Sequence, residues 1–84
     1  MPTISTFYGI IILMHLVEKE HKPPHIHAIY GDNEATFSIL TGEKLEGAFP
    51  RKGQKLVRAF IKLHKNKLLE MWSTGQYDKL PGLE

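Results

Sequence analysis

Residues 50–63 read PRKGQKLVRAFIKL, and with this stretch the apolar spacing of the chain changes from that of strands to that of a helix. Apolar residues recur here at intervals of three and four, and the pattern resumes after a polar stretch at 64–67. They are Leu56, Val57, Phe60, Ile61, Leu63, Leu68, Leu69 and Trp72. We therefore expect helical structure over 51–75, as one long helix or as two with Asn66 as a cap.

Before Pro50 the chain carries short segments of β-branched and aromatic residues separated by turn residues. These segments predict strands at 9–16, 25–30, 34–40 and 44–49, with connections of hairpin length at 31–33 and 41–43. The run 9–14 is rich in isoleucine, which favours a central strand buried on both faces. Within 34–40, Ala35, Phe37 and Ile39 alternate with polar residues and predict one apolar sheet face.

The predicted fold class is α+β, in a single small domain over 1–84. Strands over 1–49 would form a four-stranded, mainly antiparallel sheet (a β-meander), and one or two C-terminal helices over 51–75 would pack on its apolar face. Gly75 and Pro81-Gly82 would end the regular structure and leave a short, frayed tail over 76–84. A chain of 84 residues buries only about 60 to 65% of its extended surface, which favours association with a partner or a second copy.

The composition excludes several classes of protein. With 42% hydrophobic and 24% charged residues the chain has the composition of a soluble globular protein, and it contains no cysteine for disulfides, thiolate chemistry or Cys-type zinc sites. The apolar run 9–14 is too short to cross a bilayer, and no Lys or Arg precedes it as in a secretory signal. We expect a cytoplasmic protein with no membrane association.

Basic residues are concentrated in the helical segment. Between 51 and 69 there are seven Lys or Arg and no acidic residue, whereas the rest of the chain has four basic and nine acidic residues. The seven are Arg51, Lys52, Lys55, Arg58, Lys62, Lys65 and Lys67. Spacings of three, four and three place Lys55, Arg58, Lys62 and Lys65 in one helical stripe, away from Leu56, Phe60 and Leu63. Such a stripe predicts nucleic acid or an acidic protein as partner, and a merely solvated surface is the alternative.

Three of the five histidines lie in the run His21-Lys22-Pro23-Pro24-His25-Ile26-His27, where two prolines stiffen the backbone. On a strand over 25–30, His25 and His27 would share one face. The sequence predicts no cofactor, but if His21 folds back toward them, the three rings could hold a divalent transition metal. His25 or His27 could instead act as general acid or base on a phosphate ester, without metal. In the third alternative, the rings are half-buried packing residues.

Four segments together resemble the small bacterial family known as domain of unknown function 4160. They are Met1-Pro2-Thr3-Ile4, Phe7-Tyr8-Gly9-Ile10, His21-x-Pro23-Pro24-His25-x-His27-Ala28-x-Tyr30-Gly31, and Leu63-His64 followed by Leu68-Leu69 and Trp72. The proline-histidine block is the most specific part. The resemblance implies a stand-alone bacterial protein, of a kind often encoded beside other small proteins in an arrangement like a toxin–antitoxin or regulatory pair, and it implies no catalytic residues.

Two functions from different classes follow. The first is a small interaction or regulatory module, one half of a toxin–antitoxin-like pair, that meets nucleic acid or an acidic partner through Arg51, Lys52 and the stripe. The second is a metal-independent nuclease or other phosphate-handling enzyme that uses His21, His25 and His27, with a histidine-ligated metal protein as a further alternative. The residue types leave open whether the protein is an enzyme.

Overall fold

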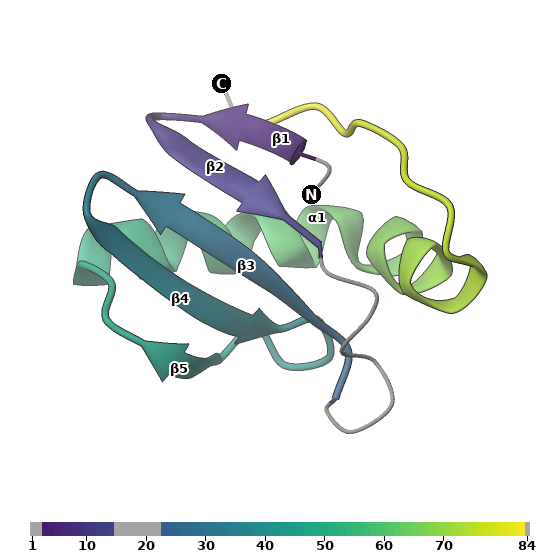
Figure 1. Ribbon diagram of the computed structural model, residues 1–84, viewed down its shortest axis with the longest axis horizontal. Coiled ribbons are helices and arrows are strands. Elements are labelled where there is room, and N and C mark those ends of the chain that lie inside the picture. The colour runs from purple at the N-terminus through teal and green to yellow at the C-terminus, as the bar shows by residue number, and fades with distance from the viewer. Residues whose placement is uncertain (1–2, 15–22, 84) are drawn as a thin grey trace.

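The fold consists of an antiparallel sheet with a long helix across one of its faces (Figure 1). The computed structural model describes residues 3–14 and 23–83. The five strands are hydrogen-bonded in the order in which they follow along the chain. The elements are β1 (Thr3–Phe7), β2 (Ile10–Leu13), β3 (His25–Tyr30), β4 (Asn33–Ser38), β5 (Lys44–Gly47) and α1 (Arg51–Thr74). The α+β class, the antiparallel meander and the C-terminal helix are therefore confirmed.

The prediction of four strands was wrong, because β1 forms a fifth strand beside β2. Phe7 pairs with Ile10, so only Tyr8 and Gly9 make the turn, and both have positive φ angles of 49° and 79°. A two-residue hairpin turn of this kind ordinarily uses Asn-Gly or Gly-Gly. Tyr8-Gly9 carries no such signal, so the sequence pattern did not reveal the hairpin.

The other strands differ from prediction mainly at their ends. β3 has the predicted bounds, whereas β4 and β5 end two residues earlier than predicted. β2 ends at Leu13, and residues 15–16 of the predicted strand lie outside the described ranges. Although β2 is flanked by two strands, Ile11 is 36% exposed, so the expectation of burial on both faces was wrong. Helix α1 covers only one face of the sheet, and Ile11 points to the other.

The core lies between the sheet and α1. Ile12 and Phe37 from the sheet and Val57 from the helix are fully buried, and the rings of Phe7 and Phe60 stack at a centroid distance of 5.0 Å. At about 25 cal/mol per Å² of apolar surface, each such side chain contributes roughly 1.5–3 kcal/mol by its burial. The predicted apolar face of Ala35, Phe37 and Ile39 is confirmed.

α1 is a single helix of 24 residues with one interruption. His64 has non-helical angles (φ −113°, ψ 20°), so the bend lies there and Asn66 does not cap a second helix. Leu63 is 63% exposed, which contradicts its predicted place in the core. The buried face of this part of the helix consists of Gly53, Val57, Phe60 and Ile61. At 100° per residue, Leu63 falls beyond the edge of that face.

The tail after α1 packs back onto the sheet instead of fraying. Gly75 ends the helix in the left-handed conformation that a C-cap requires (φ 76°). The backbone N–H of Leu80 then donates to the carbonyl of Ile4 in β1 (2.8 Å), and a side chain at Gly82 would clash with Phe7. The tail thereby covers the exposed edge of β1, where an open strand would otherwise invite pairing with another chain.

Candidate functional site

One side of α1 carries a row of cations, which we term the basic face. It comprises Arg51, Lys55, Arg58, Lys62 and Lys65, at spacings of four, three, four and three, and every one of these residues is exposed. In an unbroken helix the five positions would fall within about 80° of arc, in a row about 21 Å long. Lys65 lies beyond the bend at His64, yet it lines the same hollow as Arg58 and Lys62. Lys52 is also exposed and lies on the flank of the same helix.

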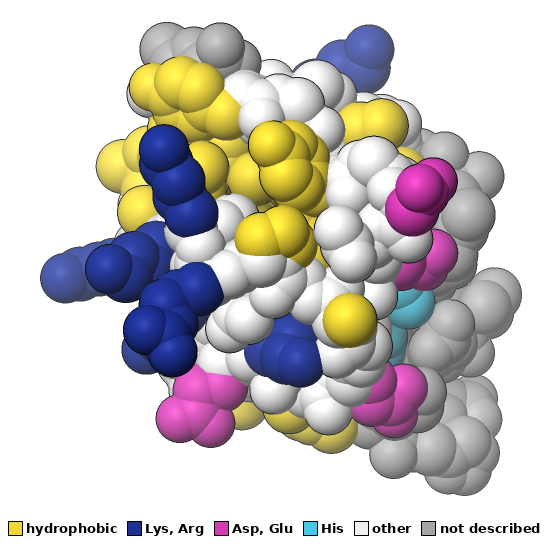
Figure 2. All heavy atoms as spheres, turned by 90° about the vertical axis from the view of Figure 1, so that its left-hand side faces the viewer, with side chains coloured by type: hydrophobic (Ala, Val, Ile, Leu, Met, Phe, Trp, Pro, Cys, Tyr) yellow, Lys and Arg dark blue, Asp and Glu magenta, His cyan; other side chains and the backbone are white. Residues whose placement is uncertain are grey.

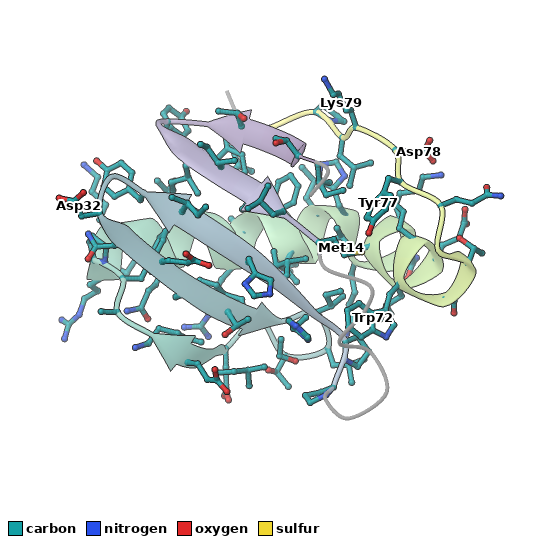
Figure 3. All side chains as sticks on the ribbon, viewed as in Figure 1. Met14, Asp32, Trp72, Tyr77, Asp78 and Lys79 are labelled. Carbon is teal, nitrogen blue, oxygen red and sulfur yellow. The ribbon has the colours of Figure 1, made fainter. Side chains whose placement is uncertain are left out.

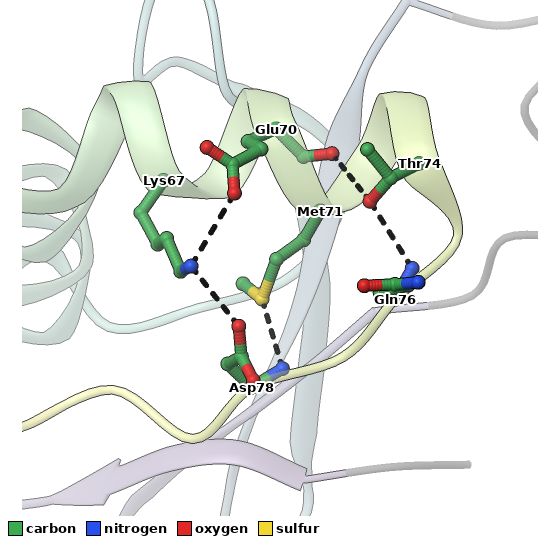
Figure 4. Close-up of polar contacts among 6 residues, drawn as sticks. All are labelled: Lys67, Glu70, Met71, Thr74, Gln76 and Asp78. Carbon is green, nitrogen blue, oxygen red and sulfur yellow. Dashed lines mark hydrogen bonds and ion pairs between the residues drawn. The ribbon is translucent and has the colours of Figure 1, made fainter.

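No carboxylate of the described residues pairs with any cation of the basic face or with Lys52. Lys67 differs: its Nζ lies 3.0 Å from Asp78 Oδ2 and 3.4 Å from Glu70 Oε1 (Figure 4). The hydrogen bonds that Lys67 donates to Asp78 and to Glu70, of which that to Asp78 has the larger effect, raise the pKa of Lys67 above its ordinary value. Any stability from this pairing is present below pH 10.5 and is lost as the pH rises through the raised pKa. Within residues 3–14 and 23–83, one helical cation is thus neutralised by carboxylates, and the other six have no acidic partner.

Three cations of the basic face line a hollow. Arg58, Lys62 and Lys65 lie around a cavity of about 280 Å³ whose opposite wall is the turn between β4 and β5, residues 39–42. Gly42 is buried there, and a Cβ built on it would lie 3.7 Å from Arg58 Cγ, so the turn approaches the helix closely. A concave surface lined by three exposed cations concentrates positive potential and attracts anionic groups.

A second, more apolar hollow lies at the N-terminal end of α1, and we term it the tyrosine hollow. It has a volume of about 520 Å³ and is lined by Tyr8, Ile10, Tyr30, Pro50, Lys52, Gly53 and Leu56. Tyr8 and Tyr30 are 53% and 41% exposed. Figure 2 shows hydrophobic side chains gathered on this end of the molecule, directly against Lys and Arg side chains. Sequence reasoning did not single out Tyr8, because the turn that carries it was itself missed.

His25 takes part in packing at the start of β3. Its side chain is fully buried, and its ring lies 5.0 Å from that of Trp72, which Figure 3 places where the start of β3 meets the end of α1. His25 Nδ1 donates to the carbonyl oxygen of Pro23 (2.9 Å); since a carbonyl only accepts, Nδ1 carries the proton. Its enclosure and this hydrogen bond hold the ring in one orientation.

His27 shares the outer face of the sheet with His25, as predicted from strand alternation. The two ring centroids are 5.3 Å apart. His27 Nδ1 lies 3.7 Å from Glu34 Oε2, and its side chain is 14% exposed. Glu34 and Glu46 border a shallow hollow beside His27. The surroundings of this ring are therefore acidic, which disfavours the approach of a phosphate.

The predicted third histidine, His21, lies outside the described residues, so the site is described here from His25 and His27. Among residues 3–14 and 23–83, no group of three or more His, Asp or Glu side chains comes close enough to hold a metal ion. His64 donates from Nε2 to the Pro81 carbonyl (2.8 Å) and so fastens the tail to the bend in α1. Within those same ranges, no helical segment combines the length and apolar content needed to cross a membrane.

The fold and the basic face define a small α+β protein whose antiparallel sheet carries one cationic helix. The chain belongs to the family described as Domain of unknown function (DUF4160), whose model matches residues 9–73. The match begins at the Tyr8-Gly9 turn and ends within α1, so it contains the proline-histidine block and the whole basic face. No curated protein and no solved structure matches the chain.

Proposed function

We propose that this protein is a small interaction module that binds nucleic acid through the basic face of α1. The observation that carries the proposal is the set of exposed cations over 51–65 that no carboxylate of the described residues neutralises. A surface that serves only solubility normally mixes both signs of charge and forms pairs along the helix. Here the only helical cation with an acidic partner in the described ranges is Lys67, beyond the basic face.

The dimensions of the basic face suit a polyphosphate. Its length of about 21 Å equals the axial rise of about six nucleotides of one strand in a B-form duplex, at 3.4 Å each. The hollow formed by Arg58, Lys62 and Lys65 lies on the same side of the helix and offers a concave place for one of these phosphates. An acidic protein would also complement the charge, but its carboxylates seldom form so regular and so dense a row.

The biological setting that we propose is regulatory. A chain of this size with a nucleic-acid-binding helix suits one half of a toxin–antitoxin-like pair in a bacterial cytoplasm. The binding residues in this proposal are Arg51, Lys52, Lys55, Arg58, Lys62 and Lys65. The nuclease and metal alternatives stay predictions. The acidic surroundings of His27 and the enclosure of His25 do not favour the nuclease, because a phosphate would be repelled by the first and could not reach the second.

The test replaces Lys55, Arg58, Lys62 and Lys65 by Gln in the untagged protein. Fluorescence anisotropy with labelled DNA and RNA oligonucleotides, in single-stranded and duplex form, is measured over a range of salt concentrations. Loss of four phosphate contacts should weaken binding on the order of 100-fold at physiological salt and reduce the slope of log K against log salt by about three to four. Circular dichroism checks that the exposed substitutions leave the fold intact.

Lys79→Gln is the matched control, because Lys79 is exposed but lies in the tail, away from the basic face (Figure 3). It should lower the affinity by less than about twofold. Failure of the wild-type protein to bind any of the oligonucleotides, or an unchanged slope in the fourfold variant, would overturn the proposal. Binding of poly-glutamate in place of nucleic acid would point to the acidic protein partner.

A further inference from the structure

Tyr8 occupies a backbone conformation that a bulky side chain rarely adopts. Its φ is 49°, in the left-handed region that glycine and asparagine prefer, and it stands at the tip of the β1–β2 hairpin. Despite this conformational cost its side chain is 53% exposed. The fold gains little burial from a tyrosine here, and Asn or Gly would suit the turn better. Backbone conformations of this kind cluster at functional sites.

Tyr30 lies on the other side of the tyrosine hollow, and its ring is held in place from beneath. A Cβ at Gly9 would come within 3.3 Å of Tyr30 Cε1, so the backbone of the hairpin turn lies against the ring. Phe49 approaches Tyr30 at a centroid distance of 6.3 Å. The ring is still 41% exposed. The hollow therefore presents two aromatic rings, one at a hairpin tip and one at the end of β3, with Ile10 and Leu56 between the strands and the helix.

The charge at the hollow is positive. Lys52 lines it, and Arg51, the first residue of α1, begins the basic face next to it. The volume of about 520 Å³ is in the range of ligand pockets. Aromatic rings beside cations are the arrangement with which proteins hold single-stranded nucleic acids: the bases stack on the rings while the cations follow the phosphates.

We propose that the tyrosine hollow receives an unpaired base of a single-stranded nucleic acid whose backbone continues along the basic face. The inference rests on the proposed function and specifies its substrate class. Stacking on Tyr8 and Tyr30 requires a base whose faces are free, which a duplex does not offer. The phosphate next to the bound base would lie at Lys52 and Arg51. The protein should then prefer single strands to duplexes of the same sequence.

Tyr8→Asn tests this directly. Asn-Gly is the residue pair that this turn favours, so the substitution removes the aromatic ring while the hairpin keeps or improves its stability. Tyr8→Phe keeps the stacking surface and serves as the control. With labelled oligo-dT and oligo-U single strands, Tyr8→Asn should weaken binding by about five- to 150-fold, whereas Tyr8→Phe should change it by less than about twofold. Duplex binding should be the same in all three proteins.

A second readout locates the base. An oligonucleotide with 5-iodouracil is photocrosslinked to the protein, and mass spectrometry identifies the modified residue. Crosslinks at Tyr8 or Tyr30 support the inference, and crosslinks confined to other residues overturn it. Comparing oligo-dT with oligo-U distinguishes DNA from RNA as the source of the strand.

The outcomes separate the inference from the proposed function. If Tyr8→Asn binds single strands as tightly as the wild type while the fourfold Gln variant loses binding, the tyrosine hollow is not a base site but the basic face still binds nucleic acid. If the wild type binds duplex and single strand equally, the inference is also overturned and the proposed function is not. If the fourfold Gln variant retains full affinity and salt dependence, the proposed function itself fails, together with the inference that rests on it.

Discussion

The histidine block at the start of β3 and the basic face of α1 differ most in the burial of their side chains and in their contacts with the rest of the protein. His25 is fully enclosed against Trp72 and bonded to Pro23, and His27 lies beside Glu34. The cations of the basic face are exposed, and no acidic side chain of the described ranges pairs with them. The described histidines of the most distinctive sequence motif are thus largely buried, whereas the basic residues, whose spacing is common in surface helices, are exposed to solvent.

This difference separates a family signature from a binding surface. A motif can be specific because a fold needs it, as when Pro23 must present its carbonyl to a buried ring. A binding surface must instead leave groups accessible and their charge uncompensated, since a partner supplies the missing counterpart. Each region therefore predicts its own effect of substitution: stability in the histidine block and affinity in the basic face.

The largest effect should come from His25→Ala. Removal of a fully buried ring leaves a cavity against Trp72 and deprives the Pro23 carbonyl of its donor. We expect the free energy of unfolding to fall by about 2–4 kcal/mol, which urea denaturation followed by circular dichroism would measure. Lys55→Ala, on the exposed side of α1, should change it by less than about 0.5 kcal/mol.

His25→Phe refines this test, because it keeps a ring against Trp72 but loses the Nδ1 donor. Its cost should be smaller than that of His25→Ala. An alanine variant as stable as the wild type would contradict the packing role and return His25 to the list of candidate catalytic residues.

A smaller effect should distinguish two lysines of the same helix. Lys62 belongs to the basic face, whereas Lys67 is paired with Asp78 and Glu70. Lys62→Gln should weaken nucleic-acid binding about fivefold at physiological salt and lower the salt slope by about one. Lys67→Gln should change the affinity by less than about twofold, because its charge is already compensated. Equal losses from both, measured by anisotropy titration, would mean that total charge and not the basic face controls binding.

The smallest effect should come from His27→Gln, which removes a titratable ring but keeps a polar side chain at a nearly buried position. Nucleic-acid affinity should stay within about twofold of the wild type, because His27 lies on the sheet face opposite to α1. The same samples are incubated with RNA and DNA and assayed for cleavage. Turnover by the wild type that disappears in His27→Gln, with binding intact, would support the nuclease alternative.

Local sequence patterns were sufficient to predict strand β3, the alternation of Ala35, Phe37 and Ile39, and the helix after Pro50. They failed to predict segments whose structure depends on contacts with residues distant in the sequence. β1 depends on a turn with an unfavourable residue, and it gains its stability from pairing with β2 and from the returning tail. The tail itself looked unstructured, because its hydrogen bond to Ile4 and its approach to Phe7 leave no local signal.

The same division holds for the candidate site. Residue spacing alone determined that Lys55, Arg58, Lys62 and Lys65 share a helix face, because the 3.6-residue period is a property of the backbone. Alternation likewise determined that His25 and His27 share a sheet face. Only the tertiary structure decided that His25 is enclosed while the basic face is open, and that Tyr8, Tyr30 and Lys52 surround one hollow. Exposure and proximity depend on which elements pack together, and packing joins residues that no local period relates.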